Sequence, residues 1–166
     1  MTRIEKHHNP YTAGIAALLA VLVIFLAVTF TSRKIHSSAS FDQVNAAILE
    51  NLDANIYPRQ GVQKLRRDLK LDSSDAQNIA WYRMDDAMSA SELLVVQFSE
   101  EQQEALESAV IKRKNAQQTL YEGYAPEQAE TMKNALIDFQ GNYGIYYTGL
   151  DGQKIDQAFL NALRRR

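Results

Sequence analysis

The chain of 166 residues has no cysteine, and its three histidines, His7, His8 and His36, all precede residue 37. Without thiol or imidazole after that point, hydrolases of the serine–histidine and cysteine–histidine classes lack a base or a nucleophile. The nitrogen and sulfur ligands that zinc prefers are missing there as well. Any acid–base chemistry after residue 36 therefore depends on carboxylates, lysines, tyrosines or hydroxyl groups.

Motifs that carry chemistry are also scarce. The sequence has no Gly-rich phosphate loop, no nucleophile elbow and no calcium-loop spacing. The acidic run 72–75 supplies too few ligands for calcium and is typical of a turn. Asp85 and Asp86 are the best paired carboxylates, but adjacent side chains point apart, which favours a solvated loop. We therefore predict no catalytic residue, no metal ligand and no cofactor.

Positive charge is in short supply over residues 41–166. This part has 14 lysines and arginines against 19 acidic residues, a net charge of −5. A protein that binds nucleic acid needs a cationic surface to displace counterions. We expect no nucleic-acid partner.

What the chain does have is a run of 22 residues, 11–32, without a charged side chain. A helix of that length covers roughly 30 Å, the thickness of the hydrocarbon core of a bilayer. The sequence thus predicts a leader (1–10), one transmembrane helix (11–32), a linker (33–40) and a single domain (41–166). The alternative is a cleaved signal peptide, but its apolar core is shorter and the small residues 37–40 lie late for a cleavage site.

The charges beside this run do not orient it. Arg3 and Lys6 precede the run, and Arg33 and Lys34 follow it. Because basic residues favour the cytoplasmic side, this arrangement is a tie.

The first half of the predicted domain begins with a capping box, Ser40 with Gln43, and a helix that ends near Asn55. A short helix follows from Val62, then two strand-like runs, 79–84 and 92–98. The second run is apolar on both faces, as a central strand is.

The second half opens with another capping box, Ser99 with Gln102, and a long helix whose apolar stripe runs from Leu106 to Leu120. A short helix starts at Pro126. Strands 135–140 and 143–148 flank a predicted type II′ turn, and a helix capped by Asp151 ends the domain. We predict an α+β fold: an antiparallel sheet of about four strands, with helices packed mainly on one face.

Tyrosine is concentrated between residues 121 and 148. Exposed tyrosines make good contact residues because they are amphipathic and lose little entropy on binding. We take Tyr124, Tyr143 and Tyr147 as candidate partner contacts. The other interpretation is that these residues serve β-structure and packing.

The order of these segments resembles a known family. The matching stretches are 69–72 (LKLD), 88–96 (MSASELLVV), the polar helix after Phe98, 124–129 (YAPEQA) and 141–143 (GNY). Over about residues 41–163 the chain is similar to the bacterial membrane- or lipid-anchored family known as domain of unknown function 4358. That family commonly carries a lipoprotein cysteine where this chain has a longer apolar run. The resemblance implies a domain outside the cytoplasm and brings no activity.

Together these observations favour a single-pass cell-membrane protein with its C-terminal domain outside the cytoplasm. The expected role is a non-catalytic accessory or binding domain for an envelope or membrane protein partner. Two alternatives remain open: a cell-envelope hydrolase that uses carboxylates only, and a cytoplasm-facing subunit of a membrane complex.

We predict that the mature protein keeps residues 1–40 and stays in the membrane pellet after carbonate extraction, because the uncharged run is long enough to span. N-terminal sequencing of the mature form checks this. A mature chain that starts at Ser40 or Phe41 would contradict the prediction.

Overall fold

The computed structural model describes residues 15, 18–23, 35–53, 55–86 and 88–165. The chain divides into two compact units, Met1–Lys34 and Ile35–Arg166. The predicted leader lies outside the described residues. So does most of the predicted transmembrane helix, of which only Ile15 and residues 18–23 are described, as helical. Within the described ranges, no helix is both long enough and apolar enough to cross a bilayer.

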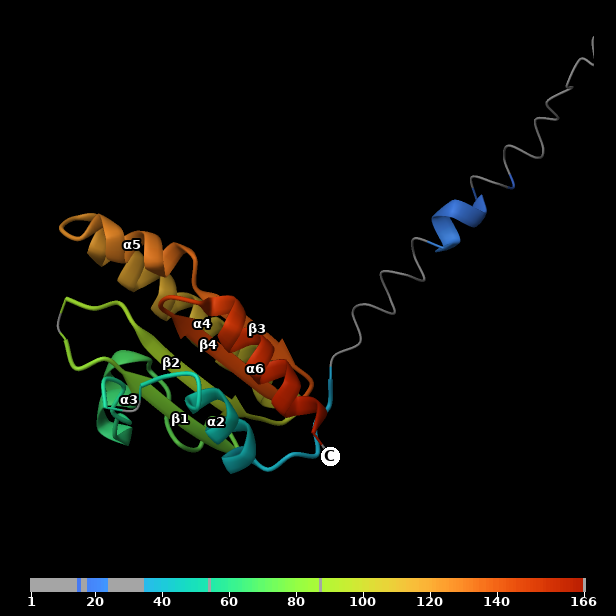
Figure 1. Ribbon diagram of the computed structural model, residues 1–166, viewed down its shortest axis with the longest axis horizontal. Helices are drawn as coiled ribbons and strands as arrows, with labels where there is room; N and C mark the ends of the chain where they lie inside the picture. Colours follow the sequence, from blue (N-terminus) through green and yellow to red (C-terminus); the bar gives the residue numbers. More distant parts are fainter. Residues whose placement is uncertain (1–14, 16–17, 24–34, 54, 87, 166) are drawn as a thin grey trace, which may run out of the picture. The chain divides into compact units, whose positions relative to one another are not determined.

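The second unit is built on one antiparallel sheet (Figure 1). In sheet order its strands are β1 (Asn78–Arg83), β2 (Glu92–Gln97), β4 (Tyr143–Thr148) and β3 (Leu136–Gln140). The four-stranded antiparallel sheet and the α+β class agree with the sequence prediction.

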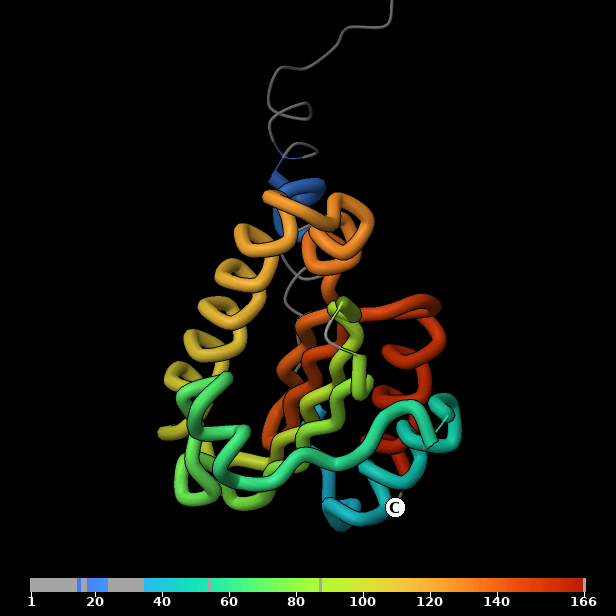
Figure 2. Tube along the Cα trace, turned by 90° about the vertical axis from the view of Figure 1, so that its left-hand side faces the viewer, coloured from blue at the N-terminus to red at the C-terminus, as the bar shows by residue number. Residues whose placement is uncertain are grey.

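The helices cover both faces of this sheet (Figure 2). On one face lie α2 (Phe41–Leu49) and α6 (Gly152–Arg164), and on the other α3 (Val62–Asp68) and α4 (Glu100–Glu122). The remaining helix, α5 (Pro126–Lys133), packs against α4. The prediction that the helices pack mainly on one face is therefore wrong.

The reason lies in the central strands. Every residue of β4 is buried, and so is β2 from Glu92 to Val96. Because successive side chains of a strand point to opposite faces, two-sided burial requires a helical layer on each side. The sequence of β2, which is apolar at consecutive positions, already indicated that helices would cover both faces of the sheet.

The capping boxes at Ser40 and Ser99 both form, and each fixes the start of its helix. The first helix is shorter than predicted: it ends at Leu49, and a turn follows in which the Asp53 carboxylate accepts from the Asn55 backbone N–H at 2.9 Å. The last helix begins after Asp151, whose side chain does not cap it and whose φ is +59°.

The inward face of α4 also differs from the predicted stripe. Leu106 and Val110 are buried as expected, but the stripe continues through Arg113 and Tyr121, while Leu120 is 53% exposed. The last turns of α4 face α5, where Tyr121 packs with Met132.

The β3–β4 hairpin receives the chain as it enters the unit. Gly141 has a φ of +55°, as a type II′ turn requires, and Phe139 lies opposite Gly144. Asn142 exchanges two hydrogen bonds with the backbone of Ser37, at 2.9 and 3.0 Å. Residues 35–40, expected to be linker, thus pack onto the hairpin, and the compact unit begins at Ile35.

Two carboxyl groups meet where α6 crosses β3. Asp156 of α6 is partly buried, and burial together with neighbouring Asp138 of β3 raises its pKa. Asp138 in turn accepts a hydrogen bond from Gln140 Nε2 at 2.8 Å.

Gly141→Val is expected to destabilise residues 35–166 by more than about 2 kcal/mol. A β-carbon there would lie 2.2 Å from the Ile35 carbonyl oxygen, and valine tolerates positive φ poorly. Urea unfolding followed by circular dichroism measures the loss. The control is Gly152→Ala, where no atom lies within 4 Å of the added carbon; equal effects of the two changes would contradict the prediction.

Candidate functional site

The three candidate tyrosines differ in exposure: two are buried and one is exposed. Tyr143 and Tyr147 are 0% and 3% exposed, and their hydroxyls donate to the backbone oxygens of Ala39 and Leu150. The expectation that one of them lies on an exposed surface is wrong, because α2 and α6 cover that face of β4. Tyr124 is 51% exposed.

The acidic pairs lie in connections. Asp85 and Asp86 are exposed between β1 and β2, where Asp86 Oδ1 accepts from the Met88 backbone N–H. In the run 72–75, Asp75 closes a turn by accepting from the Asp72 backbone N–H at 2.6 Å. Across the part of the chain that is described, no three histidine, cysteine or acidic side chains gather as a metal site.

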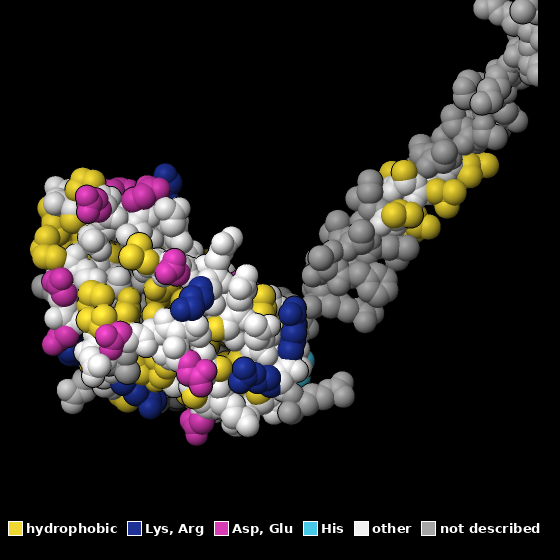
Figure 3. All heavy atoms as spheres, in the orientation of Figure 1, with side chains coloured by type: hydrophobic (Ala, Val, Ile, Leu, Met, Phe, Trp, Pro, Cys, Tyr) yellow, Lys and Arg dark blue, Asp and Glu magenta, His cyan; other side chains and the backbone are white. Residues whose placement is uncertain are grey.

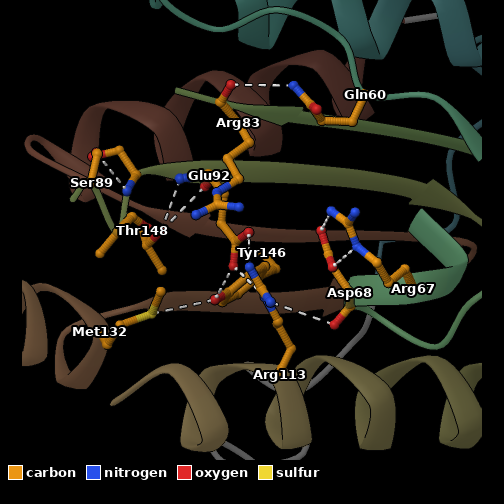
Figure 4. Close-up of polar contacts among 12 residues, drawn as sticks. Gln60, Arg67, Asp68, Arg83, Ser89, Glu92, Arg113, Met132, Tyr146 and Thr148 are labelled. Carbon is orange, nitrogen blue, oxygen red and sulfur yellow. Dashed lines mark hydrogen bonds and ion pairs between the residues drawn. The ribbon is translucent and has the colours of Figure 1, made fainter. Parts of the chain in front are cut away.

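The most unusual polar feature is an ion pair buried between the sheet and α4. Glu92 of β2 is 1% exposed and Arg113 of α4 is 9% exposed. Arg113 Nε donates to Glu92 Oε1 and Nη2 donates to Oε2, both at 3.0 Å (Figure 4). This two-pronged geometry is the strongest that arginine and a carboxylate form.

Neighbouring elements complete the pair. The Tyr146 hydroxyl of β4 donates to Glu92 Oε1 at 2.9 Å, and Met132 Sδ of α5 lies 3.6 Å from that hydroxyl. Arg113 also reaches the Asp68 backbone oxygen at the end of α3, at 3.5 Å, and lies over the Trp81 ring at 5.8 Å. Buried charges are tolerated when they are paired and hydrogen-bonded in this way.

The electrostatics follow from burial and pairing. Burial opposes the charge of Arg113, but the Glu92 carboxylate outweighs it and raises the guanidinium pKa. Burial, and then the Glu92 charge, raises the pKa of Tyr146 well above its ordinary value. The hydroxyl therefore stays protonated and remains a donor.

Glu92 and Arg113 were not among the residues predicted from the sequence, although the sequence holds a signal for the pair. Glu92 shares its strand face with Leu94 and Val96, since residues two apart lie on one face. Arg113 stands three residues after Val110 and seven after Leu106, on the inward face of the helix. An acidic residue at an inward position of the strand and a basic residue at an inward position of the helix together predict a buried ion pair.

A groove of about 550 Å³ lies beside the pair, between α4 and the segment that follows α3. Its apolar lining comes from Leu69 and Leu71 on one side and from three alanines of α4, Ala105, Ala109 and Ala116, on the other. Arg113 belongs to its wall as well. The volume is in the range of ligand-binding pockets, most of which have a mainly apolar lining with a few polar groups.

Two lysines give the groove a positive character. Lys70 and Lys112 line it and are exposed, and no described carboxylate lies within ion-pair distance of either one. The two acidic residues of the groove have other partners: Asp68 pairs with Arg67 at 2.7 Å, and Asp75 accepts from the Asp72 backbone N–H at 2.6 Å. Lys70 also has a φ of +58°, a conformation that costs a side-chain-bearing residue roughly 1 kcal/mol and is more often occupied by glycine.

We expect Glu92→Gln to cost about 3–5 kcal/mol of folding free energy, because it leaves a buried guanidinium unpaired. The double variant Glu92→Gln/Arg113→Met should lose less than the sum of the two single changes. Urea unfolding of residues 35–166 measures all three. The exposed pair of Arg66 and Asp72 is the control: Asp72→Asn should cost less than about 1 kcal/mol. Additive losses at the buried site would show that the pair is not coupled.

Comparison with known proteins places the chain in a family without an assigned function. No curated protein and no solved structure matches it. One family model matches residues 50–148, more than half of the chain, from the end of α2 to the end of β4. That span includes Glu92, Arg113 and both sides of the groove. The chain therefore belongs to the family described as Domain of unknown function (DUF4358).

Proposed function

We propose that this chain is a membrane-attached binding protein whose domain, residues 35–166, lies outside the cytoplasm and takes a peptide segment of an envelope protein. The observation that carries the binding role is the groove between α4 and the segment after α3. Attachment to the membrane rests on the uncharged run 11–32 of the sequence.

The lining of the groove suits a peptide. Its α4 wall runs from Ala105 to Gln117, roughly 18 Å along the helix axis. Small side chains on that wall let the backbone of another segment approach closely. A groove of this kind suits an amphipathic peptide that lays its apolar face against the wall.

The walls are held in place before a ligand arrives. Arg113 ties α4 to Glu92 of β2 and to the backbone oxygen of Asp68 at the end of α3. Both sides of the groove are thus fixed to the same strand. A preformed site loses less conformational entropy when it binds.

The charges indicate which peptide fits. Lys70 and Lys112 are the groove residues that lack a carboxylate partner among the described side chains. A ligand that places acidic side chains beside apolar ones would pair with both lysines and cover the alanines. We therefore assign the groove to an acidic, amphipathic segment.

The hydrolase alternative has less support. A second cavity, of about 220 Å³, is lined by the carboxylates of Asp68, Asp85 and Asp86. The hydrogen bond from Arg67 lowers the pKa of Asp68. A general acid needs the opposite shift, so that it is protonated near neutral pH. The cavity is also smaller than most ligand pockets.

Ala105→Trp and Lys112→Glu, made separately in the full-length chain, should each reduce capture of the partner by at least tenfold. The first change fills the exposed groove and the second reverses one of its charges. Chemical cross-linking in intact cells, followed by mass spectrometry, measures capture.

The matched control is Ala46→Trp, at an exposed alanine of α2 on the other face of the sheet. It should capture the partner as the unchanged chain does. Normal capture by both groove variants would overturn the proposed site. Cross-links only to cytoplasmic proteins would instead favour the cytoplasm-facing alternative.

A further inference from the structure

Three connections lie toward the end of the sheet far from the β3–β4 hairpin: β1–β2, α4–α5 and β4–α6 (Figures 1 and 2). The strand register places β1–β2 and β4–α6 there, because Glu92 lies opposite both Arg83 and Thr148. Hydrogen bonds join α5 and α4 to the first connection. Gln128 accepts from the Ala90 backbone N–H at 2.8 Å, and the Tyr121 hydroxyl donates to the Ser89 backbone oxygen at 2.9 Å.

Each connection presents one large apolar side chain to solvent. Met88 is 55% exposed and Leu150 is 86% exposed, and Tyr124 between them in sequence is about half exposed. We call these three residues, with the acidic side chains around them, the distal surface. Figure 3 shows hydrophobic side chains gathered at this end of the domain, with carboxylates among them.

Two of these three residues, Leu150 and Tyr124, are held in place by described contacts. The Tyr147 hydroxyl donates to the Leu150 backbone oxygen at 2.8 Å, and the next residue, Asp151, is held at positive φ. The Tyr124 ring packs on that of buried Tyr121, 5.6 Å between centroids. Strain is stored where the surrounding structure requires it, which often marks a functional site. A rigid display of apolar groups also lowers the entropy cost of binding.

The distal surface is acidic. Five exposed carboxylates lie on the three connections or at the helix ends beside them: Asp85, Asp86, Glu122, Glu127 and Asp151. The three connections themselves carry no lysine or arginine. Basic side chains border them: partly buried Arg83, with Lys64 and Arg67, lines the cavity beside Asp85 and Asp86, and Lys154 lies in the first turn of α6. This negative charge would repel anionic lipid headgroups and nucleic acid. It also opposes a symmetric pairing of two copies, in which the same acidic patch would meet itself.

We infer that the distal surface docks a protein partner that presents an apolar pocket bordered by lysine or arginine. Leu150 is the anchor, since it is the most exposed large apolar residue of the domain and its backbone is fixed. Met88 and Tyr124 extend the apolar contact, and the carboxylates pair with the basic border. Protein interfaces commonly have this arrangement of an apolar centre and a charged rim. The inference is independent of the groove, which lies along α4.

The test uses the full-length chain in living cells, with the photo-cross-linking residue p-benzoylphenylalanine at position 150. The control carries it at position 46. We expect a protein adduct at 150 that is missing at 46, and mass spectrometry should map the attached segment to a surface with lysine or arginine around an apolar pocket.

Removing carboxylates from the distal surface then distinguishes specific docking from a cross-link to a protein that is merely nearby. Asp85→Asn/Asp86→Asn/Asp151→Asn should lower the yield of the adduct at least fivefold. Asparagine preserves the acceptor that Asp86 offers to Met88 and tolerates the positive φ of Asp151. Glu50→Gln/Glu101→Gln/Glu104→Gln removes the same charge at exposed positions elsewhere and should leave the yield unchanged.

Four results would overturn the inference. These are no adduct at position 150, an adduct to phospholipid, an adduct to a second copy of this chain, and an adduct whose yield does not respond to loss of the three aspartates.

Discussion

The carboxylate of Glu92 is the point at which the elements around the groove are tied together. It accepts from Arg113 of α4 and from Tyr146 of β4, and through Arg113 it reaches the backbone at the end of α3. A buried carboxylate that lacks these partners would be strongly unfavourable, so each donor has to be in place when the chain folds. The main effect of the Glu92–Arg113 pair is therefore on specificity. It limits the register of β2 and β4 and the rotation of α4, and it contributes less to the free energy of folding.

Two-sided burial of the central strands explains the rest of the architecture. Because β4 is buried along its whole length, its tyrosines are divided between the two helical layers: Tyr143 and Tyr147 under α2 and α6, and Tyr146 under α4. Tyrosine suits such a strand because its hydroxyl reaches a partner at the edge of the layer, as all three do here. The hydroxyls of Tyr143 and Tyr147 also hold the segment before α2 at Ala39 and the connection at Leu150.

Much of this fold was predictable from the sequence because the signals are local. The capping boxes at Ser40 and Ser99, the turn at Gly141 and the alternation in each strand depend on neighbours within a few residues. The candidate site was not predictable in the same way. Arg113 stands at an inward position of α4, but its burial makes sense only once Glu92 is known to face it across the layer. Whether Tyr143 is exposed depends on a helix that follows it in the chain, and periodicity does not say which face that helix takes.

The carboxyl pair of Asp138 and Asp156 gives the domain an unusual dependence on acidity. Burial and the neighbouring charge raise the pKa of Asp156 above 3.8, so the folded chain still holds a proton there at pH values where the unfolded chain has released it. Folding is then coupled to proton uptake, and this contribution to stability grows as pH falls through that window. Asp68, with its lowered pKa, has the opposite effect, because its contribution is lost in acid. Mild acidification would therefore lower the cost of burying Asp156 of α6, while the side of the domain that forms the groove does not share this gain.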